Sequence, residues 1–493
     1  MDFRSVYSAD HLARMLVATG AKSGPLHHRL STGIAELIDR GELPPLAVLP
    51  AERALADALL VSRTTVVTAY HALRESGRLQ RRRGSGTWVS AATPGSKRET
   101  VSGSELAGDH LASSFLNGPL ATVDFANAAL PSLDLVADVS AGLTGADYRA
   151  LAMDHHGYHP RGLPTLRERI AAWYSAAGTP TAPDEVLVTS GAQQALELIA
   201  RGCLHPGDGV VVEEPTYRGA LEAFSRQGSR ISSVPVDRDG LDTDELDRVL
   251  AGGRSTRLVY VQAAANNPTG AVCSENRRRR LVAAVKRSEA VLIDDTSLMG
   301  TTFRGDPPPP LLTGAGDRVI TVGSMSKLFW GGLRLGWLRA PSRVISRLAQ
   351  VKGGTDLGTS LVSQEIARRL FDHIDDAAAE RRKGLDAGFA TLTDLLADHL
   401  PDWTWAEPRA GASLWVRLPQ GDATHLAQVA LRFGLALLPG AVFSAEGRTD
   451  DHTRLPYALP PHVLQEGVLR LARAWRAYTD GGLREMSLTT AVT

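Results

Sequence analysis

A lysine in a glycine- and serine-rich stretch is the first residue whose surroundings suggest chemistry. Lys327 lies in GSMSKLFWGGLRLGW, three residues after an apolar run that predicts a strand ending at Ser324. The hydroxyls of Ser324 and Ser326 and the guanidinium of Arg334 can bond the oxygens of a phosphate. An amine in such surroundings suits a Schiff base beside a bound phosphate, whereas an isolated lysine is usually a surface charge.

Further polar residues follow other apolar runs that predict strands. Ala192 and Gln193 begin a helical pattern after VLVTSG, where free backbone N–H groups attract an anion. Tyr217, in EEPTYRG, offers a ring to stack on a pyridine, and Asn267, in NNPTG, offers an amide to a phenolic oxygen. A carboxylate at the end of VLIDD would keep a pyridine nitrogen protonated, which makes the pyridine ring an electron sink.

Taken in order, GYHPRG, SGAQQAL, EEPTYRGA, NNPTG, the strand-end Asp, SMSK and GLRLGW resemble the fold-type I aminotransferases, which use pyridoxal 5'-phosphate (PLP). The resemblance implies a mainly parallel α/β domain over residues 122–493. It also implies roles for the matching residues: Lys327 forms the Schiff base, Ala192, Gln193, Ser324 and Arg334 hold the phosphate, Tyr217 stacks on the ring, Asn267 bonds the ring oxygen, Tyr158 reaches the phosphate of the other subunit, and Arg454 binds a substrate carboxylate.

Three of these assignments leave alternatives open. Asp294 is preferred to Asp295 as the partner of the pyridine nitrogen, because IDDTS fits the Asp-Glu-Thr form of this strand end. Tyr158 could instead be a packing residue, and Arg454 could be a structural ion pair. The tyrosine that the family places after the Asp is absent, with Ser297 near its position, so one hydrogen bond to the ring oxygen is lost and efficient turnover is in doubt.

The N-terminal region has the pattern of a DNA-binding unit. Residues 24–90 contain AERALADALL, a short Val-Ser turn, the helical pattern RTTVVTAYHALRESG and the hairpin pattern RLQRRRGSGTWV. Two short helices joined by a tight turn place the start of the second helix in a major groove, and the hairpin would form a wing. From Leu60 to Ser90 there are six arginines and one glutamate, a basic cluster suited to phosphates.

The stretch from LPAER to GTWV resembles the GntR-type winged helix. The resemblance implies DNA contacts from Arg53, Ser62, Arg63, Thr64, Thr65, Gly84 and Ser85. The alternatives are that Ser62 only caps the second helix and that Arg53 only pairs with an acid.

Composition limits what else the chain could be. It has 493 residues, too many for one core, with 43% apolar and 22% charged residues and no net charge. Neither cysteine has metal-ligand spacing, and no apolar run suits a signal peptide or a membrane helix, so we expect a cytoplasmic protein without a metal. Residues 1–23 predict a helical lead-in, and the Gly/Ser/Thr-rich segment 91–121 predicts a linker.

A GntR-type winged helix, a linker and an aminotransferase-like domain together resemble the MocR/GabR family of bacterial regulators. The resemblance implies a PLP-binding homodimer on operator DNA that responds to an amino compound or to PLP itself. The rival hypothesis is a working aminotransferase with a DNA-binding appendage, and steady-state transamination assays would separate the two.

Overall fold

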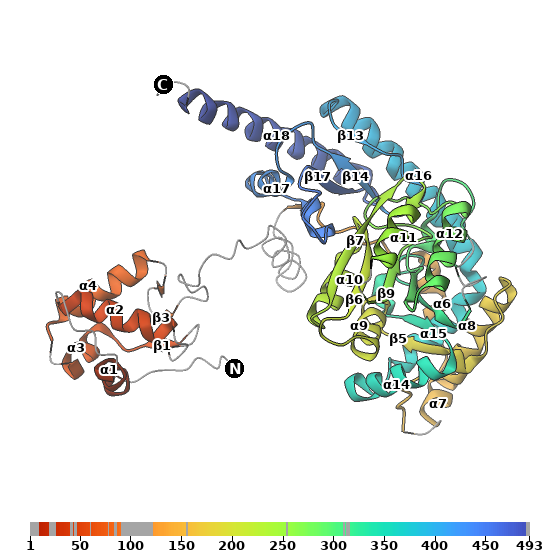
Figure 1. The fold of residues 1–493 in the computed structure, drawn as a ribbon, viewed down its shortest axis with the longest axis horizontal. Coiled ribbons are helices and arrows are strands. Elements are labelled where there is room, and N and C mark those ends of the chain that lie inside the picture. The colour runs from red at the N-terminus through yellow and green to blue at the C-terminus, as the bar shows by residue number, and fades with distance from the viewer. Residues whose placement is uncertain are drawn as a thin grey trace. The chain divides into compact units, whose positions relative to one another are not determined.

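The structure is a computed structural model that describes residues 9–18, 26–39, 43, 47–59, 61–76, 78–82, 86–89, 122–153, 156–252, 255–308, 311 and 316–489. The chain divides into two compact units, Met1–Val101 and Ser102–Thr493, which are described separately (Figure 1). The expected linker lies outside the described residues, so the boundaries at 24, 90 and 122 stay predictions.

The N-terminal unit is a helical bundle with a small sheet. Its helices are α1 (Ala9–Ala18), α2 (Leu26–Asp39), α3 (Glu52–Leu59) and α4 (Arg63–Glu75). Its antiparallel sheet has the order β1 (Val48–Leu49), β3 (Gly86–Val89), β2 (Leu79–Arg82). Helices α3 and α4 are joined by a short turn, and β2 and β3 form the hairpin. The predicted helix-turn-helix and wing are therefore confirmed as structural elements.

The start of α4 is set by Ser62, which has extended backbone angles and accepts a hydrogen bond from the N–H of Thr65. Such a cap satisfies a donor that has no partner inside the helix. Tyr70, buried in α4, donates its hydroxyl to the carbonyl of Pro50, which ties α4 to the segment before α3. The core of the unit is formed by apolar residues from all four helices, among them Leu12, Ile34 and Leu55.

The second unit is built on an eight-stranded sheet. In sheet order the strands are β5 (Val186–Thr189), β12 (Gly336–Arg339), β11 (Val319–Ser324), β10 (Val291–Asp295), β9 (Thr256–Val261), β6 (Gly209–Glu214), β7 (Arg230–Asp237) and β8 (Gly240–Leu241). All strands run in one direction except β12 and β8. Strands β5, β6, β9, β10 and β11 coincide with the apolar runs of the sequence that precede the candidate site residues, whereas β7, β8 and β12 were not anticipated.

Helices cover both faces of this sheet (Figure 1). One face packs against α8 (Pro164–Ala176), α11 (Thr243–Ala251), α12 (Glu275–Arg287) and α15 (Leu361–Leu370). The other packs against α9 (Ala192–Cys203), α10 (Arg218–Arg226) and α14 (Ser342–Asp356). Strand residues alternate between the two cores, as the pleat of a strand requires.

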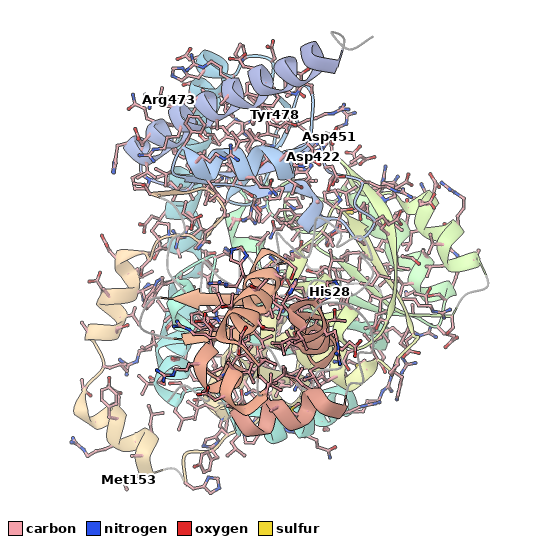
Figure 2. The ribbon with its side chains drawn as sticks, turned by 90° about the vertical axis from the view of Figure 1, so that its left-hand side faces the viewer. His28, Met153, Asp422, Asp451, Arg473 and Tyr478 are labelled. Atoms are coloured by element: carbon pink, nitrogen blue, oxygen red, sulfur yellow. The ribbon has the colours of Figure 1, made fainter. Side chains whose placement is uncertain are left out.

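A smaller lobe follows the large sheet in sequence. Its four-stranded sheet has the order β13 (Thr404–Trp405), β14 (Ser413–Arg417), β17 (His452–Pro456), β16 (Leu438–Pro439). Helices α16 (Ile374–His399), α17 (Ala423–Arg432) and α18 (Pro461–Thr489) pack with this sheet. Figure 2 shows Tyr478 of α18 near Asp422, whose backbone N–H donates to the tyrosine oxygen at 2.9 Å.

Shorter elements join the parts of this unit. Strand β4 (Val123–Asp124) pairs in parallel with β15 (Leu435–Ala436), and α6 (Asp134–Ala141) and α7 (Gly145–Met153) precede α8. Within the described ranges, no helix is long and apolar enough to cross a bilayer. In the same ranges, no group of three His, Cys, Asp or Glu side chains could hold a metal.

Candidate functional site

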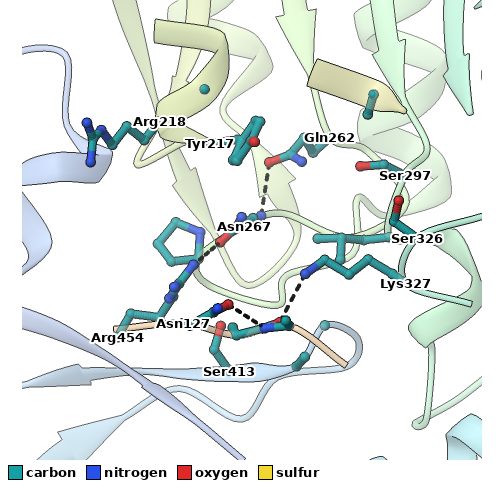
Figure 3. A pocket seen from close by; sticks show the side chains of 18 of the residues that line it. Asn127, Tyr217, Arg218, Gln262, Asn267, Ser297, Ser326, Lys327, Ser413 and Arg454 are labelled. Atoms are coloured by element: carbon teal, nitrogen blue, oxygen red, sulfur yellow. Dashed lines mark hydrogen bonds between the residues drawn. The ribbon is translucent and has the colours of Figure 1, made fainter. Parts of the chain in front are cut away.

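A cavity of about 650 Å³ collects most of the residues expected to bind a coenzyme (Figure 3). It is lined by loops after strands of the large sheet, by residues 126–130 and by the small lobe. The expected residues in its wall are Ala192, Gln193, Tyr217, Asn267, Ser324, Ser326, Lys327, Arg334 and Arg454. The fold thus brings together groups that are far apart in the sequence.

Lys327 follows β11, and its ammonium donates to the carbonyl of Ala128 at 3.0 Å. Burial, and to a smaller extent the positive charges of Arg454 and Arg381, together lower the pKa of this amine to about 8. Near pH 8, much of Lys327 is therefore in the neutral form. The neutral amine is the nucleophilic form.

Arg381 fixes the chain around that lysine. Its guanidinium donates to the carbonyls of Leu328, Phe329 and Pro131, at 2.8, 2.6 and 2.6 Å. Burial lowers the pKa of Arg381 from its ordinary value. Arg381 therefore joins the loop after Lys327 to the segment after Ala128.

An anion-binding corner lies where β5 meets α9. Gly191 precedes the helix at φ 103°, and a Cβ there would come within 3.5 Å of the Arg334 guanidinium. Arg334 adopts left-handed angles, φ 49° and ψ 48°, which are uncommon for a residue with a side chain. Its Nη2 donates to the carbonyl of Ser190 at 2.7 Å. A guanidinium beside a helix N-terminus suits a phosphate.

Tyr217 presents its ring to the cavity between β6 and α10. Its hydroxyl donates to Oε1 of Gln193 at 3.0 Å, while Nε2 of Gln193 donates to the carbonyl of Gly219 at 3.1 Å. A Cβ at Gly219 would collide with both side chains, at 2.1 Å from Gln193 and 2.6 Å from Tyr217. The glycine is required for this arrangement, which fixes the plane of the ring.

Arg454 and Asn267 meet on another wall of the cavity (Figure 3). Nη1 of Arg454 donates to Oδ1 of Asn267 at 3.4 Å, and Nη2 donates to the carbonyl of Ala126 at 2.7 Å. Nε is buried without a hydrogen-bond partner, and the guanidinium lies 4.9 Å from the ring of Phe443. Burial lowers the pKa of Arg454 to about 10. Among the described residues no carboxylate pairs with Arg454, so the structural ion pair considered above is not found.

The two neighbouring aspartates point to opposite faces of the sheet. Leu292 belongs to the core on the α12 face and Ile293 to the core on the α9 face, so alternation places Asp294 with the former and Asp295 with the latter. Tyr217 also packs on the α9 face.

Their hydrogen bonds agree with that placement. Oδ2 of Asp294 accepts from the N–H of Leu311, whereas Oδ2 of Asp295 accepts from the hydroxyl of Tyr260 at 2.7 Å and lies 3.5 Å from Nε2 of Gln262, which lines the cavity. Asp295, the alternative considered above, thus shares a face of the sheet with Tyr217, whereas Asp294 faces the opposite core.

Two other expectations concern Tyr158 and Ser297. Tyr158 is 57% exposed and does not line the cavity of its own chain. Ser297 does line the cavity, and its N–H donates to Oδ1 of Asp295 at 3.0 Å. The position expected to carry a phenol thus carries a short hydroxyl.

The start of α4 holds the residues expected to contact DNA. The side chains of Arg53 and Thr64 are exposed, and that of Arg63 is 70% exposed at 4.0 Å from Glu52. The hydroxyls of Ser62 and Thr65 lie 2.8 Å apart, so these two residues act as a cap in the free protein. The expected wing residues Gly84 and Ser85 lie outside the described residues.

Several cavity residues were missed at the level of sequence. Gln262 ends an apolar run, which is a readable signal, and Arg218 lies in EEPTYRG but was given no role. Asn127, Ser413 and Glu222 carry no motif. Asn127 follows β4, which pairs with β15, and Ser413 begins β14, which pairs with β17, so neither residue comes from a strand of the large sheet.

The geometry of the residues present fits PLP. A buried amine of lowered pKa, an anion corner and a fixed aromatic ring line one cavity, and the buried carboxylate of Asp295 lies behind Gln262 in the cavity wall. These are the groups that an aldehyde, a phosphate, a pyridine ring and a pyridine nitrogen need.

Comparison with known proteins agrees with both units. Residues 141–471 match the family "Aminotransferase class I and II", and residues 27–89 match "Bacterial regulatory proteins, gntR family". The chain is 30% identical to the HTH-type transcriptional regulator TauR of Rhodobacter capsulatus, over 92% of this chain and 97% of TauR. It is 29% identical to the probable rhizopine catabolism regulatory protein MocR of Rhizobium meliloti, over 97% of this chain and 99% of MocR.

Among solved structures, the second unit is similar to the α-aminoadipate aminotransferase LysN of Thermus thermophilus, complexed with N-(5'-phosphopyridoxyl)-L-leucine. The TM-score is 0.66 at 30% identity, covering 76% of this chain and 97% of LysN. This chain belongs to the aminotransferase class I and II family, has PLP as its cofactor, and is a MocR-type transcriptional regulator whose GntR-type domain binds DNA.

Proposed function

We propose that the protein is a homodimer in which an amino compound reaches PLP on Lys327 and thereby changes how two winged helices are presented to operator DNA. The observation that carries this proposal is the buried guanidinium of Arg454, which lines the same cavity as Lys327 and whose Nε has no hydrogen-bond partner among the described residues. The charge of Asp124 acts on this guanidinium, but no carboxylate of the described residues forms an ion pair with it. A buried cation that is not directly paired is costly, so a ligand carboxylate would stabilise it. The planar fork of Arg454 can make two parallel bonds to such a group.

Each wall of the cavity has a part in this proposal. When bound, PLP supplies an electrophilic carbon for amines and an electron-accepting ring. Lys327 holds PLP covalently, and Asp295 keeps the pyridine nitrogen protonated. The other proposed contacts are Ala192, Gln193, Ser324, Ser326 and Arg334 to the phosphate, Tyr217 to the ring face and Asn267 to the ring oxygen.

Exposed apolar side chains support the homodimer. Tyr158, Trp330 and Leu357 are 57%, 43% and 51% exposed, and Figure 2 shows Met153 projecting from the end of α7. Trp330 is three residues from Lys327, and Gly358 packs against the backbone of His159, beside Tyr158. Exposed large apolar side chains are typical of a subunit interface. We propose that Tyr158 reaches the phosphate of the other subunit across it.

For DNA, we propose that Arg53, Arg63 and Thr64 make direct contacts, with Ser62 and Thr65 presenting the start of α4 and Gly84 and Ser85 lying at the wing. Two such helices per dimer would read two half-sites. The effector shifts DNA affinity only if it binds one arrangement of the dimer better than another.

The test is a DNA-binding titration on the upstream region of the protein's own gene, with PLP-loaded protein, with PLP-free protein and with candidate amines. The proposal expects the operator affinity of the loaded protein to change with an amine. A response to PLP alone would favour sensing of the coenzyme itself.

A transamination assay on the same samples separates the rival hypothesis. Fast turnover with unchanged DNA affinity would indicate a working aminotransferase. Lys327→Ala serves as the control for coenzyme attachment: a borohydride-reducible adduct that survives in this variant would contradict the assignment of Lys327.

A further inference from the structure

The charged groups that line the cavity are few and of nearly one sign. Among the described residues, four cations line it: Arg218, Lys327, Arg334 and Arg454. In that part of the chain Glu222 is the one acidic side chain of the lining. The number of lining cations that are not already paired therefore limits how many negative charges of a ligand the cavity can neutralise.

Two of these cations are assigned to the coenzyme in the proposed function. Lys327 holds PLP, and Arg334 lies in the anion corner beside Ser190. They leave Arg218 and Arg454 for the rest of the ligand.

Arg218 is already neutralised. Its Nε pairs with Glu222 four residues later on α10. Glu222 also accepts from Arg226 at 3.1 Å, and Arg226 in turn bonds Glu197 at 2.6 Å. Two arginines and two glutamates alternate along this chain of ion pairs, so it has no net charge and no cation free for a further carboxylate.

Arg454 is the remaining cation, and its partners are neutral. Its Nη1 and Nη2 bond the amide oxygen of Asn267 and the carbonyl of Ala126, and Nε has no hydrogen-bond partner in the described part of the chain. The other lining side chains are amides, hydroxyls and apolar groups such as Asn127, Ser413 and Phe443.

We infer that the effector is an amino acid with one carboxylate and an uncharged side chain, and that Glu222 excludes dicarboxylic amino acids by occupying Arg218. This inference rests on the proposed function and names the class of its effector. A second carboxylate would enter the cavity without a free cation, which costs free energy because the charge loses water and gains no partner. A cationic side chain meets Arg218, because Glu222 is already shared by two arginines. The preference for neutral amino acids would then come from the Arg218–Glu222 pair, which disfavours ligands with a charged side chain.

The test uses PLP-loaded full-length protein and follows the visible absorption of the coenzyme during titration with each standard amino acid. The matched pairs glutamine and glutamate, and asparagine and aspartate, differ chiefly in charge. Neutral amino acids are expected to change the spectrum, and each amide is expected to act at a concentration at least about tenfold below that of its acid.

Two variants locate the cause. Glu222→Gln frees Arg218 and should reduce or invert the ratio between glutamate and glutamine. Glu197→Gln is the matched control, because it removes a carboxylate from the same chain of ion pairs outside the cavity lining and should leave the ratio unchanged.

Each contrary result has a separate meaning. If glutamate acts at the same concentration as glutamine in the unmodified protein, the inference is overturned while the proposed function stands. If the preference exists but Glu222→Gln leaves it unchanged, the role of Glu222 is overturned. If no amino acid changes the spectrum, both the inference and the amino-compound part of the proposed function fail.

Discussion

The hydroxyl of Tyr260 donates to Oδ2 of Asp295 at 2.7 Å, between neighbouring parallel strands β9 and β10. Both residues are buried on the α9 face of the large sheet. Burial raises the pKa of Asp295, and this hydrogen bond opposes the rise because it favours the charged carboxylate. Tyr260 is thus a positioning residue for the carboxylate proposed to face the pyridine nitrogen.

Tyr260→Phe should weaken PLP binding. The variant removes a hydrogen bond to a charged group, which is worth about 1.5–3 kcal/mol, so the Kd for PLP should rise by roughly tenfold or more. Absorbance titration of PLP-free protein measures it. Tyr174→Phe is the control, since Tyr174 bonds Trp337 in the core on the opposite face. Equal losses in both variants would mean that Tyr260 contributes only to general stability.

The two aspartates should behave differently when neutralised. Asp295→Asn should weaken PLP binding strongly, because the amide cannot keep the pyridine nitrogen protonated. Asp294→Asn should retain binding, because Asp294 faces the other core, where burial raises its pKa to about 6. PLP titrations of both variants, with thermal melts to control for folding, make the comparison. If Asp294→Asn loses more affinity for PLP than Asp295→Asn does, then Asp294 is the partner of the pyridine nitrogen.

This pair also shows what the sequence could and could not predict. The apolar runs identified five of the parallel strands, among them the edge strand β5, and the motifs identified Lys327, Tyr217, Asn267 and Arg454 as residues of one site. Choosing between Asp294 and Asp295 required knowing which core faces α9 and α10, since adjacent strand residues differ only in face.

Other features had no local signal at all. Strand β12 is antiparallel and short, and its motif GLRLGW was read for chemistry rather than as a strand. The pairing of Arg218 with Glu222 matches the spacing of any surface ion pair on a helix, and only the fold places it at a cavity.

Attachment of PLP should depend on pH through Lys327. Because burial lowers the pKa of this amine to about 8, the attachment rate should rise with pH and level off above that value as the neutral amine becomes dominant. Arg381→Met removes a positive charge near Lys327. The loss of this repulsion favours the protonated amine, so the midpoint of the attachment profile should move to higher pH. Stopped-flow absorbance from pH 6 to 10 measures both profiles. A midpoint that falls in Arg381→Met would contradict the electrostatic coupling.

Arg63→Ala should weaken specific DNA binding by about 1–3 kcal/mol if the guanidinium reads a base. The control is Arg74→Ala, at the other end of the same helix, where Nε donates to the carbonyl of Tyr70. Operator and random duplexes are titrated at fixed salt, because affinity for DNA depends on counterion release. Equal operator affinity of Arg63→Ala and unmodified protein would remove Arg63 from the DNA interface.

Substitution of Arg454 tests most directly whether effector binding in the second unit changes DNA binding by the first. The measurement is operator affinity across a titration with the effector, for unmodified protein, Arg454→Ala and Arg454→Lys, with the coenzyme spectrum recorded in parallel. Arg454→Ala should keep PLP and bind operator without effector, because the coenzyme and DNA contacts come from other residues, yet it should not respond to an amino acid. Arg454→Lys should restore little of the response, since an ammonium lacks the two-pronged fork. A response of Arg454→Ala at the effector concentrations that act on the unmodified protein would contradict the account.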